Sequence, residues 1–382
     1  MAVRVSKPEV NLRDKLNKAE PPIGAHGSQL LKSKSTSETF DLVRAGRRNL
    51  IINGDMRIWQ RSGGADVTGA TGLKFGPDRW MFEEGCANLV TTLTRSTDTP
   101  YDQGFKYSFK LSPSQVESAL DSSDFAQYMY FIEGYDAAPA QWGTINAKPC
   151  TLSFWLKTNM GGEHYVSVNS HAGTDTWSTS VRSTMNVWEH HVITIPPPMT
   201  GSWYYTNGRG IEIRIGLMRS ANVTQANSGQ WFHGGGNYNG FADAHSDWAF
   251  NTAHSAYLTG VQFEIGSQAT PFEHRPYAEE LALCMRYYEG IIMGTGTALF
   301  RTWTNTAGSP TNVSNAEYHF KVEKRATPTW TVEGNAAWYP SGTSGMSAYP
   351  STSMCLFQRN DTTHQFFSDG AGDLCGSFSC EI

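Results

Sequence analysis

The chain has 382 residues and a formal net charge of -5 at pH 7, so it is long enough for two domains or one large β domain. Nucleic acid and membrane surfaces are not expected partners, because both attract a basic protein surface. No apolar run reaches about 18 residues, so we expect no membrane insertion. Charged residues make up only 17% of the chain, which also holds 37 glycines and 12 tryptophans. This composition favours a turn-rich β protein.

Residues 1–46 differ from the rest because they carry many charges and few aromatic side chains. Ser6 and Glu9 have the spacing of a capping box, which predicts a short helix that ends before Pro21. A helix this short is marginally stable alone, so its apolar stripe is expected to bind another surface. The alternative is a disordered or self-packed extension. The residues that we expect to dock are Val10, Leu12 and Leu16.

Residues 47–275 are predicted to form one domain of many strands separated by turn-rich loops, the pattern of a β-sandwich or jelly roll. In one predicted strand, Phe154 shares a face with Leu152, whereas Trp155 points to the opposite face. The clearest strands are predicted at 152–158, 165–169, 188–195 and 211–217.

Residues 259–289 connect this domain to the C-terminal part of the chain. An alternating strand is predicted to end at Gly266, and a helix is predicted to begin at Pro276 and to end at Gly290. The apolar stripe of the helix is expected to pack against a second β unit. Residues 276–382 are therefore predicted to comprise a linking helix and a smaller C-terminal β domain.

Four segments together resemble a widespread group of tailed-phage virion proteins, which are fibre or appendage proteins with a jelly roll similar to carbohydrate-binding modules. In the first of them, an Asn-Gly turn separates two runs that we expect to be extended. The resemblance covers most of 47–289 and extends more weakly to the strand-like end of the chain. The four segments are 47–61, 75–80, 151–157 and 259–289.

The resemblance implies a mainly β protein located in the virion. Its jelly-roll β-sandwich would carry a short N-terminal helical arm that docks on a capsid or tail protein. Host-surface polysaccharide is a further implied partner, and proteins of this kind are usually homotrimers. The first residues lack the apolar core of a secretory signal, so synthesis and assembly in the host cytoplasm are expected.

No catalytic motif is present in the sequence, and no spacing singles out a pair of carboxylates, so no enzymatic activity is expected. We expect no cofactor and no metal site. The related modules often hold a structural calcium ion beside acidic residues of the last strand. Here Thr259 and Gly260 occupy those positions, which makes calcium doubtful, although Asn53 and Asp55 could supply oxygen ligands.

Aromatic side chains are the remaining candidates for function, because the C–H groups of a sugar ring pack on an aromatic face beside polar partners. Each of them could instead belong to the core or to a subunit interface. Within its strand, Trp155 is a better exposed candidate than Phe154 because it points away from the apolar face. The glycan-contact candidates are Trp155, Trp203, Tyr204, Tyr205 and Trp177.

Three functions remain open from the sequence. The first is a virion appendage that docks by its N-terminus and contacts host glycan. The second is a secreted or cell-surface bacterial carbohydrate-binding protein. The third is a purely structural decoration of the capsid or tail, without receptor binding.

Overall fold

The computed structural model describes residues 47–171, 174–220, 228–233, 247–293, 298–303, 314–332, 337–339, 347–359, 363–367 and 373–381. The chain divides into two compact units, Met1–Arg48 and Asn49–Ile382, and the described residues belong almost entirely to the second. The docking candidates Val10, Leu12 and Leu16 lie outside the described residues.

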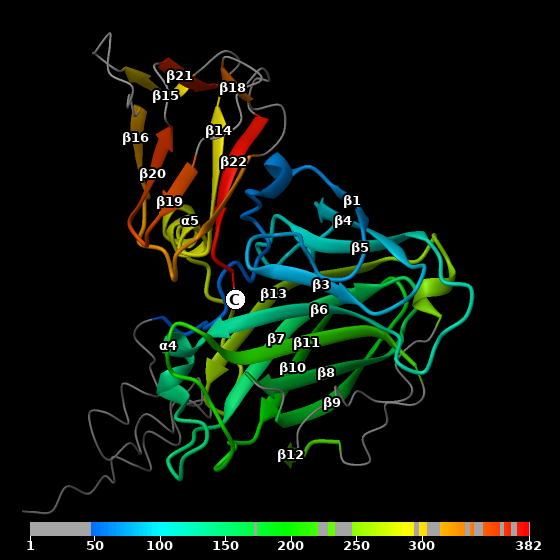
Figure 1. The fold of residues 1–382 in the computed structure, drawn as a ribbon. Helices are drawn as coiled ribbons and strands as arrows, with labels where there is room; N and C mark the ends of the chain where they lie inside the picture. The colour runs from blue at the N-terminus through cyan, green and yellow to red at the C-terminus, as the bar shows by residue number, and fades with distance from the viewer. Residues whose placement is uncertain are drawn as a thin grey trace, which may run out of the picture. The chain divides into compact units, whose positions relative to one another are not determined.

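A sandwich of two antiparallel sheets forms the larger part of the second unit (Figure 1). Sheet A contains, in spatial order, β1 (Val67–Ala70), β4 (Val90–Ser96), β5 (Ser108–Gln115), β13 (Ala256–Ile265), β7 (Cys150–Thr158) and β10 (Glu189–Ile195). Sheet B contains β12 (Trp231–His233), β9 (Asp175–Ser183), β8 (Gly162–Ser170), β11 (Arg209–Arg219), β6 (Phe125–Glu133), β3 (Trp80–Glu84) and β2 (Lys74–Phe75).

The inner faces of the two sheets share one hydrophobic core. The period-two patterns that predicted the strands supply its side chains, because alternate residues of a strand point to the same side. The prediction of a mainly β, jelly-roll sandwich is confirmed. Its central contributors include Leu152, Phe154 and Leu156 of β7 and Ile211, Ile213 and Ile215 of β11.

Short helical segments lie between some of the strands along the chain. They are the 3-10 turns η1 (Arg61–Gly64), η2 (Ala138–Ala140) and η3 (Trp248–Phe250) and the helices α4 (Gly134–Ala137) and α5 (Tyr277–Met285). In the part of the chain that the structure describes, no helix is long and apolar enough to cross a membrane.

The predicted extended runs in 47–61 are wrong, because no strand forms on either side of the Asn-Gly turn. The turn itself is present, and Asn53 has a φ of 59°. Its side chain is used within the protein: Oδ1 accepts a hydrogen bond from the Ile58 amide at 2.9 Å, and Nδ2 donates to the Asp78 carbonyl at 2.9 Å. Side-chain bonds of this kind replace the ladder that a strand would need.

Asp55, the other oxygen donor considered for calcium, forms an ion pair with Arg57 at 3.0 Å. Burial raises the pKa of its carboxyl group, and Arg57 opposes that rise. Asn53 and Asp55 therefore both have protein partners.

Helix α5 ends earlier than predicted, with Arg286 as its C-cap, and Gly290 lies inside a strand. Strand pairing explains the difference, because Tyr288 is already opposite Ser379 of the last strand. Cys284 of the helix packs with Ile52 and Ile58 of the segment before the sandwich. The packing of the predicted stripe on a second β unit stays a prediction.

The rest of the unit contains three antiparallel three-stranded sheets within the described ranges. The first is β14 (Tyr288–Met293), β22 (Asp373–Ser379) and β17 (Thr329–Val332). The second is β15 (Ala298–Trp303), β21 (Thr363–Phe367) and β18 (Ala337–Tyr339). The third is β16 (Ser314–His319), β20 (Met354–Arg359) and β19 (Ser347–Pro350).

Buried charged groups join the sandwich to these C-terminal sheets. Arg79, which directly precedes β3, forms an ion pair with Glu381, and its guanidinium lies 3.6 Å from the ring centre of Tyr287. Glu133 of β6 pairs with Arg286 at 2.7 Å. The two regions are thus linked by hydrogen-bonded charges, and the domain boundaries expected from the sequence stay predictions.

Candidate functional site: an aromatic pocket on sheet A

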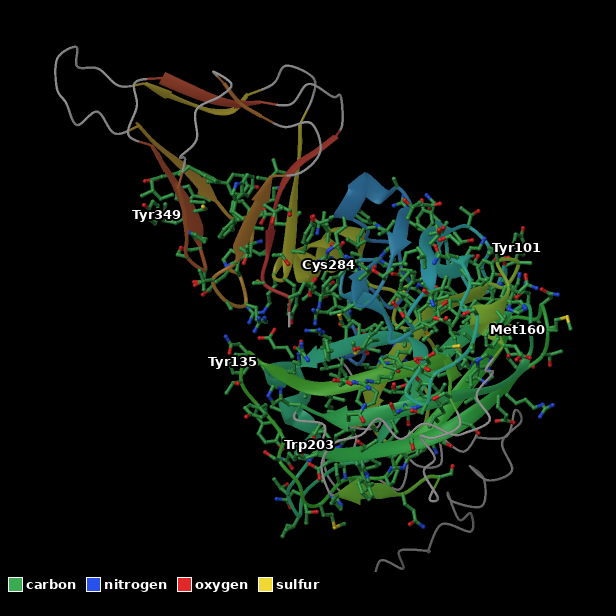
Figure 2. The ribbon with its side chains drawn as sticks, turned by 45° about the vertical axis from the view of Figure 1, so that its right-hand side comes forward. Tyr101, Tyr135, Met160, Trp203, Cys284 and Tyr349 are labelled. Carbon is green, nitrogen blue, oxygen red and sulfur yellow. The ribbon has the colours of Figure 1, made fainter. Side chains whose placement is uncertain are left out.

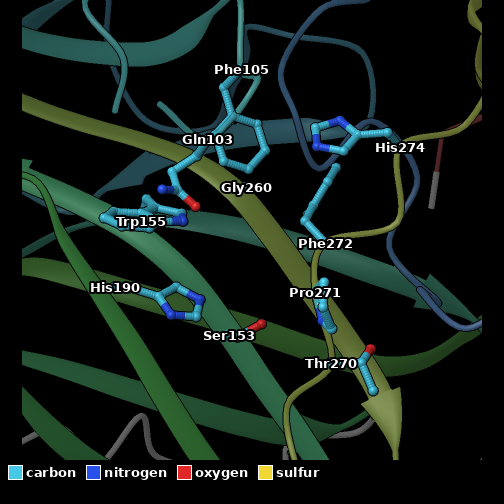
Figure 3. A pocket seen from close by; sticks show the side chains of 10 residues that line it. All are labelled: Gln103, Phe105, Ser153, Trp155, His190, Gly260, Thr270, Pro271, Phe272 and His274. Carbon is cyan, nitrogen blue, oxygen red and sulfur yellow. The ribbon is translucent and has the colours of Figure 1, made fainter. Parts of the chain in front are cut away.

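A pocket of about 230 Å³ lies on the outer side of sheet A (Figure 3). Ser153 of β7, His190 of β10 and Gly260 of β13 contribute to it from the sheet itself, while the connections around Gln103 and Pro271 supply residues from outside the sheet. Trp155 also lines the pocket, on the face of β7 opposite to the core residue Phe154. The orientation predicted for Trp155 from its strand is confirmed.

One wall of the pocket is a stacked pair of rings. His190 of β10 and Trp155 of β7 are cross-strand partners, with ring centres 5.0 Å apart and planes inclined by 26°. Partial loss of solvent lowers the pKa of His190, although the residue remains exposed. This wall therefore presents two uncharged rings near neutral pH.

The other wall contains three further rings, which lie across the pocket from Trp155 and His190 in Figure 3. Phe105 precedes β5, and its ring centre is 5.0 Å from that of Phe272. The ring centre of His274 is 4.9 Å from that of Phe272 and 5.4 Å from that of Phe105. No local pattern in the sequence indicates that Phe105 meets the 272–274 segment, because only the fold brings them together.

Gly260 is required where the two walls approach each other. The pairing of β13 with β7 is irregular between Thr259 and Gln262, and Gly260 has a φ of +62°. A Cβ atom at this position would lie 2.6 Å from the Phe105 ring and 2.9 Å from the Trp155 ring. A glycine inside a strand pattern often marks a bulge or a close approach, and this signal in the sequence could have located the pocket.

The connection between β4 and β5, which carries Gln103 and Phe105, is anchored to the sheet by Asp98. Oδ1 of Asp98 accepts a hydrogen bond from the Trp188 indole at 2.9 Å, and Oδ2 pairs with Lys157 Nζ at 2.5 Å. Asp98 thereby holds this side of the pocket against β7 and the start of β10.

Several polar groups that line the pocket are free for a ligand. Ser153 is 3% exposed, and within the described chain its hydroxyl makes no hydrogen bond. Within the described chain, the Gln103 side-chain amide and the rings of His190 and His274 likewise make no hydrogen bond. Thr270 differs, because its hydroxyl donates to Glu264 at 2.8 Å.

Two of the other glycan-contact candidates lie in a separate aromatic group, the Trp142 group, formed by Trp142, Trp203, Trp231 and Tyr205. The ring centres of Trp203 and Trp231 are 4.9 and 5.5 Å from that of the buried Trp142. Tyr205 is 36% exposed, and its hydroxyl donates to the Trp142 carbonyl. Figure 2 shows Trp203 far from Tyr101, which precedes Gln103 of the pocket.

Tyr204 and Trp177 complete the comparison with the sequence. Tyr204 is 44% exposed and packs against His171 at 4.2 Å between ring centres. The prediction that Trp177 contacts glycan is wrong. Trp177 is 3% exposed and belongs to the hydrophobic core, so a glycan cannot reach its ring. Its place in β9 points it inward.

Among the described residues, one group has possible metal ligands close together: Cys86, Glu117 and Asp124, whose ligand atoms lie within 4.8 Å of one another. Glu117 already accepts hydrogen bonds from the backbone and side chain of Asn88 at 2.8 and 2.9 Å. Asp124 likewise accepts one from the Asp121 amide at 2.8 Å. These bonds account for the carboxylates without an ion.

The fold and the pocket define a mainly β protein with a two-sheet sandwich and an aromatic pocket on one outer face. No protein-family model matches the sequence, and no curated protein matches it.

Solved structures similar to the chain include a phage tailspike domain and carbohydrate-binding modules. The enzymatically active domain of bacteriophage CBA120 tailspike protein 4 is 14% identical over 55% of this chain, with a TM-score of 0.28. This chain spans only 22% of that tailspike chain. TmCBM61, solved with β-1,4-galactotriose, is 14% identical over 58% of this chain and 100% of its own, with a TM-score of 0.28.

The CBM22-1 xylan-binding domain of Paenibacillus barcinonensis Xyn10C is 10% identical over 59% of this chain and 100% of its own, with a TM-score of 0.29. The assignment of a two-sheet sandwich rests on the strand order and shared core of this chain.

Proposed function

We propose that this protein binds carbohydrate without catalysis, and that the pocket on sheet A is its binding site. The observation that carries the proposal is the pairing of aromatic walls with free polar groups in one pocket. Trp155 and His190 face Phe272 across it, and Ser153 contributes a hydroxyl with no partner among the described residues.

Sugar rings need both features of this pocket. Their C–H groups pack on aromatic faces, and their hydroxyl groups need hydrogen-bonding partners at the edge of the ring. None of the lining residues is an aspartate or glutamate. Glycoside hydrolysis in most enzymes uses two such carboxylates, so the pocket is suited to binding rather than to cleavage.

Screening the intact protein against an array of bacterial surface polysaccharides and defined oligosaccharides tests this function. We expect at least one glycan to bind, and Trp155→Ala to weaken that binding by about tenfold, or about 1.4 kcal/mol. Trp203→Ala is the matched control, because Trp203 is also a partly buried tryptophan but lies in the Trp142 group. Binding of no glycan, or equal binding by Trp155→Ala, would contradict the proposal.

The protein is further proposed to be a virion appendage that docks by residues 1–46 and presents its β domains to the host. The support is the sequence resemblance over 47–289, together with the short amphipathic helix predicted in the N-terminal arm. We expect mass spectrometry to detect the protein in purified phage particles. Deleting 1–46 should remove it from the particles without changing glycan binding.

Two alternatives predict different results. A secreted carbohydrate-binding protein would be found in the medium of uninfected bacteria and would be missing from purified particles. A purely structural decoration would be present in the particles, yet deletion of residues 47–382 would leave adsorption to the host unchanged.

A further inference from the structure

We propose that the pocket on sheet A selects a single uncharged sugar ring and discriminates against rings that carry a carboxylate. This inference rests on the proposed glycan-binding function and adds the chemical class of the ligand. It comes from the charges and hydrogen bonds around the pocket, which Figure 3 shows from close by.

The pocket offers neutral hydrogen-bonding groups. None of its lining residues is an aspartate, glutamate, lysine or arginine. Its available polar groups are the Ser153 hydroxyl, the Gln103 amide and the rings of His190 and His274. Since burial lowers the pKa of His190, its ring is neutral at physiological pH. Hydroxyl groups, which both donate and accept, match such a set.

Two of the cations close to the pocket in sequence are already paired, whereas Lys106, which follows Phe105, is exposed and lies over the ring of Tyr107. Lys157, two residues beyond Trp155 on β7, holds Asp98 at 2.5 Å. Arg275, which follows His274, lies 3.3 Å from Glu280 and is 4% exposed. The lining itself therefore offers a ligand carboxylate no lysine or arginine as a counter-charge, whereas the hydroxyl groups of a neutral ring meet groups that can donate and accept hydrogen bonds.

The volume of the pocket limits the ligand to one ring. Its 230 Å³ lies below the range of about 300–1,000 Å³ that is usual for pockets that enclose a drug-sized molecule. We therefore expect the pocket to accept one residue of a glycan, with the remainder outside.

The test compares monosaccharides that differ only at carbon 6. Glucose is paired with glucuronate and galactose with galacturonate, and binding to the full chain is measured by ligand-observed NMR at about pH 7.5, where the ring of His190 is neutral. A neutral monosaccharide is expected to bind at least about tenfold more tightly than its uronate.

A charge variant makes the test sharper. Gln103→Lys places a cation at the pocket and should raise uronate affinity by about tenfold, as expected for a charged hydrogen bond. Tyr101→Lys is the matched control, because Tyr101 lies two residues away, is 97% exposed and does not line the pocket. It should leave the preference unchanged.

The outcomes separate the inference from the function beneath it. Equal or tighter binding of the uronate by the unmodified protein overturns the inference alone. An equal gain of uronate affinity in both lysine variants also overturns it, because the gain would then come from general charge. Failure of every sugar and every array glycan to bind overturns the proposed function and the inference together.

Discussion

The pocket on sheet A and the Trp142 group are both rich in aromatic rings, but they use their polar atoms differently. In the Trp142 group the indole N–H groups of Trp142, Trp203 and Trp231 donate to backbone carbonyls, at 2.8, 3.2 and 2.7 Å. In the pocket, by contrast, the hydroxyl of Ser153 and the ring of His190 make no hydrogen bonds within the described chain.

This difference teaches that exposed aromatic rings alone do not identify a binding site. A ring whose neighbours have satisfied all their hydrogen bonds stabilises the fold, whereas unused donors and acceptors beside an aromatic wall are available to a ligand. The two groups should therefore respond to substitution in opposite ways, one in stability and the other in binding.

The largest expected effect is on stability, in the Trp142 group. Trp142 is 1% exposed, so Trp142→Ala should lower the free energy of unfolding by about 3–5 kcal/mol through the cavity it leaves. Denaturant unfolding measures the loss. Glycan affinity of the folded fraction should stay unchanged, and a loss below about 1 kcal/mol would contradict the structural role.

Gly260→Ala should have the next largest effect, on both stability and binding. Its Cβ would press on the Phe105 and Trp155 rings, and the added strain and overpacking should cost about 2–3 kcal/mol. Gly72→Ala is the control, because Gly72 has a φ of +63° and nothing lies within 4 Å of the position that an alanine methyl group would take. It should cost only about 1–2 kcal/mol and leave glycan affinity intact. Equal affinity losses in the two variants would argue against the close approach at Gly260.

Asp98→Ala should have a smaller effect, because it releases the connection that carries Gln103 and Phe105. Loss of the hydrogen bond from Trp188 and of the pair with Lys157 should cost about 1 kcal/mol of stability and weaken glycan binding several-fold. Asp98→Asn keeps an acceptor for Trp188 and should lie between the wild type and Asp98→Ala in a titration. Wild-type affinity in Asp98→Ala would show that the anchor does not shape the pocket.

The smallest expected effect is one of pH, and it should arise in the pocket. Burial holds the pKa of His190 below its ordinary value of 6.5, so the folded state binds this proton less readily than the unfolded state. The contribution of His190 to stability is complete above about pH 6.5 and declines as the pH falls through the lowered pKa.

Thermal unfolding of the wild type and of His190→Gln between about pH 7.5 and 5 measures this effect. The difference in melting temperature between the two proteins should shift in favour of the variant as the pH falls. A difference that does not change with pH would contradict the partial desolvation of this imidazole.

Local sequence patterns were sufficient to predict the clearest strands of the sandwich and the direction of Trp155 in the pocket. The alternation in β7 placed Leu152 and Phe154 in the core and Trp155 on the opposite face, because the period of a strand fixes these directions. Trp177 was predicted wrongly, because β9 directs it into the core.

The second wall could not be predicted in this way. Phe105 and Phe272 belong to connections 167 residues apart by their numbers, and only the pairing of β5 with β13 brings those connections together. Gly260 did carry a signal in the sequence. There it was interpreted as the absence of an acidic calcium ligand, whereas in the structure it marks a bulge in β13 beside the pocket. Strand pairing also decided where α5 ends, since Tyr288 joins β22 rather than the helix.

The central claim is that a ligand contacts the pocket and not the Trp142 group. The indole N–H signals of the 12 tryptophans in ¹⁵N-labelled protein, assigned by single substitutions and followed during titration with a glycan that binds, test this claim most directly. The indole signal of Trp155 should move progressively to saturation, while those of Trp142, Trp203 and Trp231 stay in place. A saturable shift of the Trp203 and Trp231 signals, with that of Trp155 unmoved, would contradict the claim.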